Sequence, residues 1–543
     1  MFKKAISLVL VLCLTLALCA CANGTTSSTA PTPSKDETPA SSAAASEAEK
    51  LGYPVVSSPI TVKGVVVALD MTYPRTVWQD VEKVTGVKFE FENIETDAFS
   101  VYVAAGNWPD FFHCSMDNSQ INDYGITGKK FADYKEYLDL MPNLQQTFKD
   151  YPQAQKAVTE TNGAIYQLPY IEESATVGQA RVYYREDVLK AAGQKVPTTT
   201  EEFYNVLKVL KDYNDGAAPL VCGINEASYV GVALYSAFGP ETTSDFEEDA
   251  NQKVQYNRLG DQYRHYLSYI NKLYKEGLLH QEYLTLDGAT QKSLAQAGKT
   301  VFMDGTAGHS LTEKDFASGT VELNVLAPLT SEYDSERVYI GQLPINTGAG
   351  FFINAESKYI KELARCFDIM YATEEVAPGT GLYGESFCYG NQGVTWDYSN
   401  ADKSEYKFIQ PDSWTDSFTN YQYKCVIYTN SGRATALKGC VTSTPGNNQA
   451  RQKGFVSNMQ PYMDKDPFPT KFLKFDEDEQ TIITDNYTDI KKYVDEMHDK
   501  FISGVEDVND DTTWATYCKR IKDMHIDEVL KVYQASYDRW LAS

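Results

Sequence analysis

The pattern of apolar and polar positions predicts alternating strands and helices at the start of the folded part of the chain. Residues 65–69 form a continuous apolar run, which is typical of a buried strand. Trp78, Val81 and Val84 then recur at helical spacing, and residues 87–91 alternate apolar and polar side chains as a half-buried strand does. A strand, a helix and a second strand in this order form the unit of a parallel sheet, so an α/β fold is expected.

Residues 104–112 predict a turn that leads into another buried strand. This stretch reads Ala-Ala-Gly-Asn-Trp-Pro-Asp-Phe-Phe, and its glycine, asparagine and proline supply turn conformations. The apolar strand continues to residue 114 and is followed by the small polar residues Ser115, Asp117 and Asn118. Ligands of open α/β sheets bind outside the carboxyl ends of strands. These residues are therefore candidates for ligand contact, and a turn with a purely structural role is the alternative.

A longer helix is predicted after residue 199. Thr199 or Thr200 can cap it, and Glu201 and Glu202 fall in its first turn, where the helix dipole favours negative charge. One apolar face follows, formed by Phe203, Val206, Leu207 and Leu210.

The amino-terminal residues 1–20 predict a signal peptide, because two lysines precede an apolar run. The run ends Leu-Cys-Ala-Cys and resembles the lipobox of bacterial lipoproteins, in which the chain is cut before the cysteine and its thiol is acylated. Cys21 is the predicted lipidation site. The run is shorter than the roughly 20 residues of a membrane-spanning helix, and a plain secretory signal or a membrane anchor is the alternative. Residues 21–52 are rich in Ser, Thr, Ala and Pro and predict a flexible tether.

Charge and composition restrict the partners. The chain has 49 basic and 74 acidic residues, a net charge of −25. This excess opposes binding to nucleic acid and to anionic membrane surfaces, and it favours an uncharged ligand. The 38 tyrosines are compatible with a sugar-binding surface, because a tyrosine ring offers a flat apolar face and a polar tip. Most of them are nevertheless expected to serve ordinary packing.

The motifs of common catalytic and metal sites are missing from the sequence. The ten cysteines contain no Cys-x-x-Cys pair, so a zinc site of the usual spacing is not expected. A disulfide framework is also not expected, although Cys425 and Cys440 could pair. No HExxH or GxSxG motif occurs, and the Gly-Lys-Thr at residues 298–300 lacks the first glycine of a P-loop because Ser293 stands there. The sequence therefore predicts a protein that is not an enzyme.

A series of short segments resembles, in the same order, the motifs of family 1 extracellular solute-binding proteins, and of LipO-like lipoproteins in particular. The segments are residues 85–89, 104–110, 163–170, 182–189, 196–203, 271–278, 298–303 and 349–355, together with the carboxyl-terminal region 500–540. The resemblance implies an α/β, two-lobed, periplasmic-binding-protein-like fold of type II, the Venus flytrap, with crossing interdomain strands. Lobe 1 is expected at 53–172 and 330–400, and lobe 2 at 173–329 and 401–543.

The resemblance also implies roles for residues that follow the turn motif. Asp110 would be structural, whereas Asp117, with Ser115 just before it, would face the hydroxyl groups of a sugar. Cys114 stands where the family's maltose-type members have a stacking tryptophan. That departure puts this one ring contact in doubt.

Further ligand-facing residues are expected elsewhere in the chain. Tyr184 occupies the position of a tyrosine that would stack on a sugar ring. Glu172 or Glu173 would line the crossing between the lobes. His309 and Trp396 are additional candidates, with a core or surface role as the alternative for each.

No metal or cofactor is expected. Many LipO-like proteins carry a calcium-loop-like segment after the helix that begins near residue 200. Residues 212–220 of this chain lack the spaced oxygen ligands and the terminal glutamate that such a loop requires.

The resemblance implies a lipid-anchored protein on the extracellular face of the cell membrane of a Gram-positive-type bacterium. It would capture a carbohydrate, most plausibly an oligosaccharide, by cleft closure and deliver it to the permease subunits of an ABC importer. A monomer that binds no nucleic acid is expected. The alternatives are a binding lipoprotein for a peptide or a nucleoside, and a surface lipoprotein that degrades or adheres to glycans.

Overall fold

The computed structural model describes most of the chain from residue 51 onward. The long described ranges are 51–67, 76–171, 182–222, 234–239, 245–303, 321–338, 350–384 and 467–543. Shorter pieces are described at residues 311, 343, 345–347, 386–389, 393, 396–398, 401, 406–408, 432–433, 454 and 457–462. The predicted signal peptide, the lipidation site Cys21 and the tether up to residue 50 lie outside the described residues. Within the described ranges, no helix has both the length and the apolar character needed to span a membrane.

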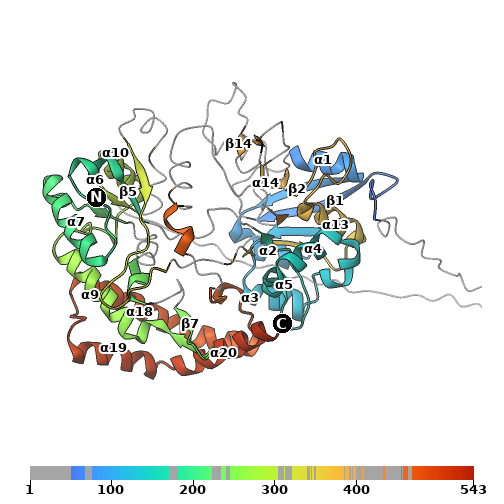
Figure 1. Cartoon of the computed structure of the whole chain (residues 1–543). Coiled ribbons are helices and arrows are strands. Elements are labelled where there is room, and N and C mark those ends of the chain that lie inside the picture. Colours follow the sequence, from blue (N-terminus) through green and yellow to red (C-terminus); the bar gives the residue numbers. More distant parts are fainter. Residues whose placement is uncertain are drawn as a thin grey trace, which may run out of the picture. The chain divides into compact units, whose positions relative to one another are not determined.

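The first sheet is mixed and contains four strands in the order β12-β3-β1-β2. Figure 1 labels β1 and β2 of this sheet. β1 (Ile60–Val67) pairs in parallel with β2 (Val87–Ile94) and with β3 (Phe111–Cys114). β12 (Gly350–Ile353) pairs antiparallel with β3. The helix α1 (Thr76–Thr85) connects β1 to β2, so the predicted strand–helix–strand unit is confirmed.

Aromatic rings pack tightly on one face of the first sheet. The indole of Trp78 lies 4.5 Å from the ring of Phe89, and the rings of Phe111 and Phe367 are 5.3 Å apart. Gly64 of β1 makes this packing possible, because a Cβ there would come within 2.1 Å of the Phe111 ring. Burial of such large apolar side chains is a main source of stability. We call the buried residues around this sheet the first core; they come from 55–171, 345–387 and Phe472.

Short helices surround the first sheet. They are α2 (Phe99–Ala104), α3 (Asn118–Gln120), α4 (Pro142–Asp150), α5 (Pro152–Val158), α13 (Ile360–Asp368) and α14 (Ser386–Tyr389). α4 and α5 both begin with proline, whose missing N–H and fixed φ suit the first position of a helix.

The second sheet also has four strands, in the order β10-β5-β9-β6. β5 (Tyr183–Arg185) pairs antiparallel with β10 (Leu323–Val325) and with β9 (Phe302–Met303), and β6 (Leu220–Val221) pairs in parallel with β9. These strands are only two or three residues long, so helices supply most of the surrounding structure. Among the described residues, the helices between β5 and β10 include α6 (Glu186–Ala191), α7 (Thr200–Tyr213), α9 (Asp261–Lys275) and α10 (Gly288–Gln296). The predicted cap of α7 is confirmed, because the Thr199 hydroxyl accepts a hydrogen bond from the Glu202 N–H.

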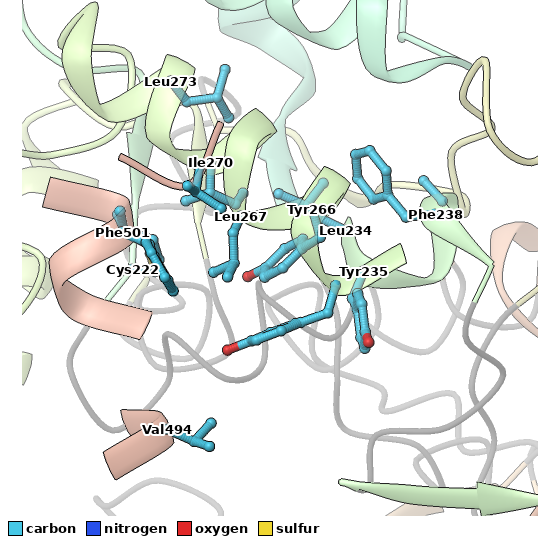
Figure 2. Packing of buried hydrophobic residues seen from close by; sticks show 14 of the residues in the cluster. Cys222, Leu234, Tyr235, Phe238, Tyr266, Leu267, Ile270, Leu273, Val494 and Phe501 are labelled. Atoms are coloured by element: carbon cyan, nitrogen blue, oxygen red, sulfur yellow. The ribbon is translucent and has the colours of Figure 1, made fainter. Parts of the chain in front are cut away.

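The carboxyl-terminal helices pack against the second half of the molecule. They are α17 (Glu477–Ile482), α18 (Thr488–Ser503), α19 (Asp511–Asp523) and α20 (Ile526–Ala542), and the hairpin of β7 (Phe246–Glu248) and β8 (Val254–Tyr256) contacts α20. Figure 2 shows Leu267, Ile270 and Leu273 of α9 in the same cluster as Val494 and Phe501 of α18. We call the buried residues around this sheet the second core; they come from 182–329, Met459 and 468–537.

Two strands carry the chain between the sheets. β4 (Tyr170–Ile171) is the last element before β5, and β11 (Ile345–Asn346) is the last element before β12. β4 and β11 pair antiparallel with each other, and β15 (Gly432–Arg433) pairs in parallel with β4. The crossing strands predicted from the sequence are therefore present. The exact lobe boundaries stay a prediction.

Candidate functional site

The pairing register identifies which end of the first sheet meets the crossing strands. Cys114, the last residue of β3, lies opposite Gly350, the first residue of β12. Because β11 directly precedes β12, the chain arrives from the crossing at this end. Ser115 and Asp117 follow Cys114 and are exposed. They therefore lie at the edge that an α/β protein uses for its ligand, and their contact with a ligand stays a prediction.

Local hydrogen bonds fix the orientation of Asp117. Its Oδ1 accepts a hydrogen bond from the Gln120 N–H at 2.8 Å, and the Gln120 Oε1 accepts one from the Asp117 N–H at 3.1 Å. This reciprocal capping box begins α3. Since the cap engages Oδ1, the other carboxylate oxygen is the one available to accept a hydrogen bond from a ligand hydroxyl.

Two residues that precede Asp117 have structural roles. Asp110 accepts hydrogen bonds from the Lys63 N–H at 2.8 Å and from the Ser357 hydroxyl at 2.7 Å, so its predicted structural role is confirmed. Cys114 is 1% exposed, and burial raises the pKa of its thiol. With so little surface, Cys114 offers a ligand nothing in place of the family's tryptophan.

The register also identifies the matching end of the second sheet. Tyr183 of β5 lies opposite Met303 of β9 and opposite Val325 of β10, and Val221 of β6 lies opposite Met303. The carboxyl ends of β6, β9 and β10 thus meet at the end where the chain enters β5 from the crossing. In both sheets, therefore, the edge predicted to bind the ligand is the edge at which the chain arrives from the crossing strands.

Tyr184 lies inside the second sheet and is only 2% exposed. Its ring centroid is 6.0 Å from that of Phe302, and burial raises the pKa of its hydroxyl to about 12. A ring that stacks on a sugar needs one open face, so this burial argues against the predicted role. The assignment of Tyr184 to the ligand stays a prediction that affinity measurements must decide.

The other predicted contacts have no described side chain. Glu172 and Glu173 directly follow β4, and His309 follows β9, and all three lie outside the described residues. Trp396 begins β13 (Trp396–Tyr398), which pairs with β14 (Tyr406–Phe408), and its side chain also lies outside the description. Their roles stay predictions.

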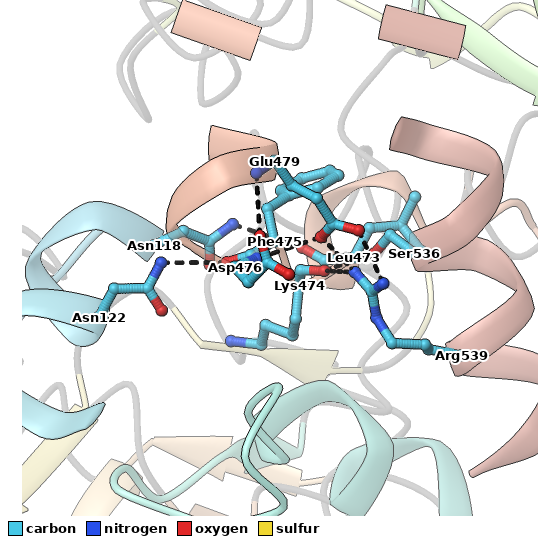
Figure 3. A network of polar contacts seen from close by, with 9 residues as sticks. All are labelled: Asn118, Asn122, Leu473, Lys474, Phe475, Asp476, Glu479, Ser536 and Arg539. Carbon is cyan, nitrogen blue, oxygen red and sulfur yellow. Dashed lines mark hydrogen bonds and ion pairs between the residues drawn. The ribbon is translucent and has the colours of Figure 1, made fainter. Parts of the chain in front are cut away.

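Sequence reasoning missed a polar network that begins next to Asp117 (Figure 3). The side-chain amide of Asn118 donates to the Leu473 carbonyl at 3.4 Å, and that of Asn122 donates to the Phe475 carbonyl at 3.0 Å. Asn122 is 8% exposed. The spacing of four residues between the two asparagines was the available signal, because it puts them on one helical face. Their partner, however, is far away in the sequence.

The described residues offer no metal site. Among them, no group of three or more His, Cys, Asp or Glu side chains could hold a metal ion. After α7 the chain turns through Asp215, whose carboxylate lies 3.6 Å from the Lys299 ammonium. Cys114, Cys366 and Cys518 form no disulfide, and the candidate pair Cys425 and Cys440 lies outside the described residues.

Two α/β sheets joined by crossing strands define the class of the protein: it has the type II fold of two-lobed solute-binding proteins. Comparison with solved structures agrees. FusA of Streptococcus pneumoniae, solved as an EF-hand mutant with fructo-nystose, matches 89% of this chain and 100% of its own at 19% identity, with a TM-score of 0.67. An HMO-binding, ABC-transporter-associated solute-binding protein of Bifidobacterium longum infantis matches 89% of this chain and 99% of its own at 20% identity, with a TM-score of 0.70.

Particular relatives are found in sequence as well. The chain is 22% identical over 529 residues to the fructooligosaccharide ABC transporter substrate-binding protein FusA of Streptococcus pneumoniae, covering 92% of this chain and 91% of FusA. It is 26% identical over 233 residues to the lipoprotein LipO of Bacillus subtilis, covering 40% of this chain and 44% of LipO. No family model matches the chain. The resemblance to carbohydrate-type solute-binding proteins is therefore confirmed.

Proposed function

We propose that this protein is the substrate-binding component of an ABC importer for an oligosaccharide. The observation that carries the proposal is the similarity to FusA, which spans nine tenths of both chains and is named for its fructooligosaccharide transport. A similarity of that extent leaves less than a tenth of either chain unmatched. The protein would bind its ligand without turnover, in line with the names of its relatives.

The ligand would bind where the two sheet edges meet the crossing strands. Pockets of two-lobed proteins form at the interface between lobes, and a ligand that binds the closed state better shifts the protein toward closure. Asp117, with one carboxylate oxygen left over from its helix cap, suits the hydroxyl groups of a neutral sugar. The strong negative charge of the chain also favours an uncharged ligand over an acidic one.

The lobes would comprise residues 53–172 with 330–400, and 173–329 with 401–543. The composition of the two cores supports this division, because the first core draws on 55–171 and 345–387 and the second on 182–329 and 468–537. Phe472 is an exception, since it packs in the first core. The protein would act as a monomer and would bind no nucleic acid.

Calorimetry of the chain without its leader tests the sugar proposal. Kestose, nystose, a human milk oligosaccharide, a mannose-containing N-glycan, a tetrapeptide and a nucleoside would be titrated separately. Binding of one saccharide at micromolar concentration or tighter, with no released reducing sugar after overnight incubation, is the expected result. Saturable binding of the peptide or the nucleoside alone would overturn the proposal, and so would hydrolysis of a glycan.

The proposed attachment to the extracellular face of the membrane depends on acylation of Cys21. In cells expressing the full chain, wild-type protein should be in the membrane fraction and should incorporate a labelled fatty acid. Cys21→Ser should remove the label and release the protein from that fraction. Cys19→Ser is the matched control and should change neither property. A labelled, membrane-bound Cys21→Ser variant would show that the lipidation site is wrong.

A further inference from the structure

One short segment lies between the two cores close to the predicted ligand edge. Phe472 packs in the first core, whereas Phe468 before it and Leu473 and Phe475 after it pack in the second core. The chain therefore reaches into the first core at Phe472 and returns to the second core at Leu473. We call Leu473, Lys474 and Phe475 the joint segment.

The backbone carbonyls of the joint segment are held from two opposite sides. The Leu473 carbonyl accepts a hydrogen bond from Asn118, the first residue of α3, and the Phe475 carbonyl accepts one from Asn122, in the turn that continues α3. The Lys474 carbonyl instead accepts from two α20 side chains (Figure 3), the Ser536 hydroxyl at 2.7 Å and the Arg539 guanidinium at 2.8 Å. Alternation of this kind is the pattern of an extended chain paired on both edges.

An ion pair adds a third link between the joint segment and the first half. The Lys474 ammonium lies 2.8 Å from the Glu160 carboxylate, and the two side chains are only 13% and 3% exposed. Removing one partner of a buried pair leaves an uncompensated charge, so the link resists rearrangement. Three side-chain interactions, from Asn118, Asn122 and Glu160, thus connect the joint segment to the part of the chain around the first sheet.

The asparagine links and the predicted ligand contact belong to one short stretch of chain. Asp117 caps α3, Asn118 is the first residue of α3, and Asn122 lies in the π-helical turn Ile121–Thr127 that continues it. π-helical turns of this kind often mark functional sites. The same turn therefore carries Asp117 at the predicted ligand edge and the two amides that contact the joint segment.

We propose that Asn118 and Asn122 are positioning residues. They couple ligand contact at Asp117 to the position of the joint segment. A ligand that pulls on Asp117 moves α3, and the two amides carry that movement to the segment that links the cores. The coupling runs in both directions, because a free-energy coupling between two sites is reciprocal. This inference rests on the proposed function for the nature of the ligand, but not for the link itself.

A double-mutant cycle tests the coupling with the saccharide that binds in calorimetry. Asn122→Ala should weaken binding about tenfold although Asn122 does not face the ligand edge. Asp117→Asn should also weaken it, and the combined variant should lose much less than the product of the two single effects. The matched control is Asn271→Ala, because Asn271 is a 4% exposed asparagine that donates to the Phe501 and Ile502 carbonyls within the second half. Purely multiplicative effects, or an equal loss of affinity in the control, would overturn the proposal.

A ligand-free experiment separates this inference from the proposed function. Glu160→Gln weakens the joint segment without touching α3, and hydrogen exchange of the Gln120 and Ile121 amides should become several-fold faster in the absence of any sugar. Both amides donate to Asp117, so they report on the turn at the ligand edge. Glu276→Gln, whose carboxylate accepts from the Tyr204 hydroxyl in the second half, is the control and should leave these amides unchanged. If hydrogen exchange of the two amides were unchanged in Glu160→Gln, the proposed coupling would be wrong. If exchange became faster but the protein bound no saccharide in calorimetry, the coupling would stand and the proposed sugar-binding function would be wrong.

Discussion

The two cores of the molecule are built from different aromatic side chains. The first core packs mainly tryptophan and phenylalanine rings against one another, as where Trp78 meets Phe89. The second core is rich in tyrosine, and tyrosine rings surround an ion pair: the Arg258 guanidinium lies 4.8 Å from the centre of the Tyr263 ring and pairs with Asp245 at 2.6 Å. Buried tyrosines of the second core are Tyr183, Tyr184, Tyr204, Tyr235, Tyr256, Tyr263, Tyr266, Tyr283, Tyr517, Tyr533 and Tyr537.

The difference teaches how to interpret the abundance of tyrosine in the sequence. An apolar ring needs only contact area, whereas a buried hydroxyl or charge also needs a partner. The Tyr487 hydroxyl, for example, donates to the Asp245 carboxylate. The second core therefore depends on directional contacts. Many of the tyrosines whose abundance in the sequence is compatible with sugar binding are instead packed inside this core.

The largest expected effect concerns the ion pair of the second core. Arg258→Met leaves the Asp245 carboxylate without its guanidinium partner. Both side chains are 19% exposed, and the loss of one member of such a largely buried pair costs up to about 4 kcal/mol of unfolding free energy. Two cation–π contacts, with Tyr263 and Tyr235, are lost at the same time. Urea unfolding followed by circular dichroism measures the change.

The control for this variant is Arg520→Met, because Arg520 is exposed on α19. It should change the stability by less than about 0.5 kcal/mol, as surface substitutions usually do. If Arg258→Met were as stable as the control, the second core would not depend on directional contacts, and the contrast between the cores would disappear.

Substitutions of Tyr184 in the second core distinguish a packing role of its ring from contact with the ligand. Tyr184→Ala should lower the unfolding free energy by about 3 kcal/mol, because a large buried ring is replaced by a cavity. Tyr184→Phe keeps the ring and should leave both stability and sugar affinity close to wild type if the ring only packs. A loss of affinity in Tyr184→Ala at temperatures where it is folded, with normal affinity in Tyr184→Phe, would instead support the predicted stacking role.

A buried carboxylate of the first core should give a pH signature. Asp368 is fully buried and accepts hydrogen bonds from the Leu144 N–H at 2.9 Å and the Asn143 amide at 2.8 Å. Burial raises the pKa of Asp368 to about 6, although these donors oppose the shift. The native state then binds a proton more tightly than the unfolded chain, whose aspartates titrate near pH 4.

The sign of the effect follows from this difference in pKa. Stability from Asp368 is fully present below about pH 4 and is lost as the pH rises through 6, by about 3 kcal/mol in total. Asp368→Asn should remove this dependence, so the stability difference between variant and wild type should change between pH 4 and 7. Asp245 behaves in the opposite way: burial alone would raise its pKa, but Arg258 and Tyr487 hold that pKa below its usual value. A pH-independent difference for Asp368→Asn would show that Asp368 is ionised throughout this range.

The sequence could predict the elements whose pattern is local. The strand–helix–strand unit of β1, α1 and β2, the turn before β3 and the Thr199 cap all depend on neighbouring residues. The strands β6 and β9 have two residues each, which is too short for any period to appear.

Long-range contacts set the limit for the candidate site. Asn122 and Phe475 are 353 positions apart, and nothing near either residue indicates that the other is its partner. Tyr184 stands where the resemblance expects a ligand-stacking tyrosine, yet its ring packs near Phe302 in the second core and is 2% exposed. The motif therefore locates the strand correctly, whereas the exposure of the side chain depends on neighbours that the motif does not contain.

The smallest effect on stability, and the most informative on function, is expected at Asp117. Asn caps helices about as well as Asp does, so Asp117→Asn should change the unfolding free energy by less than about 0.5 kcal/mol. It replaces a charged acceptor with a neutral one, and hydrogen bonds to charged groups are the stronger kind, so saccharide affinity should fall about tenfold, or about 1.4 kcal/mol. The matched control is Asp287→Asn, because Asp287 caps α10 in the same way by accepting from the Thr290 N–H at 2.7 Å. Equal affinities of the two variants would mean that Asp117 serves only to cap its helix and makes no contact with the ligand.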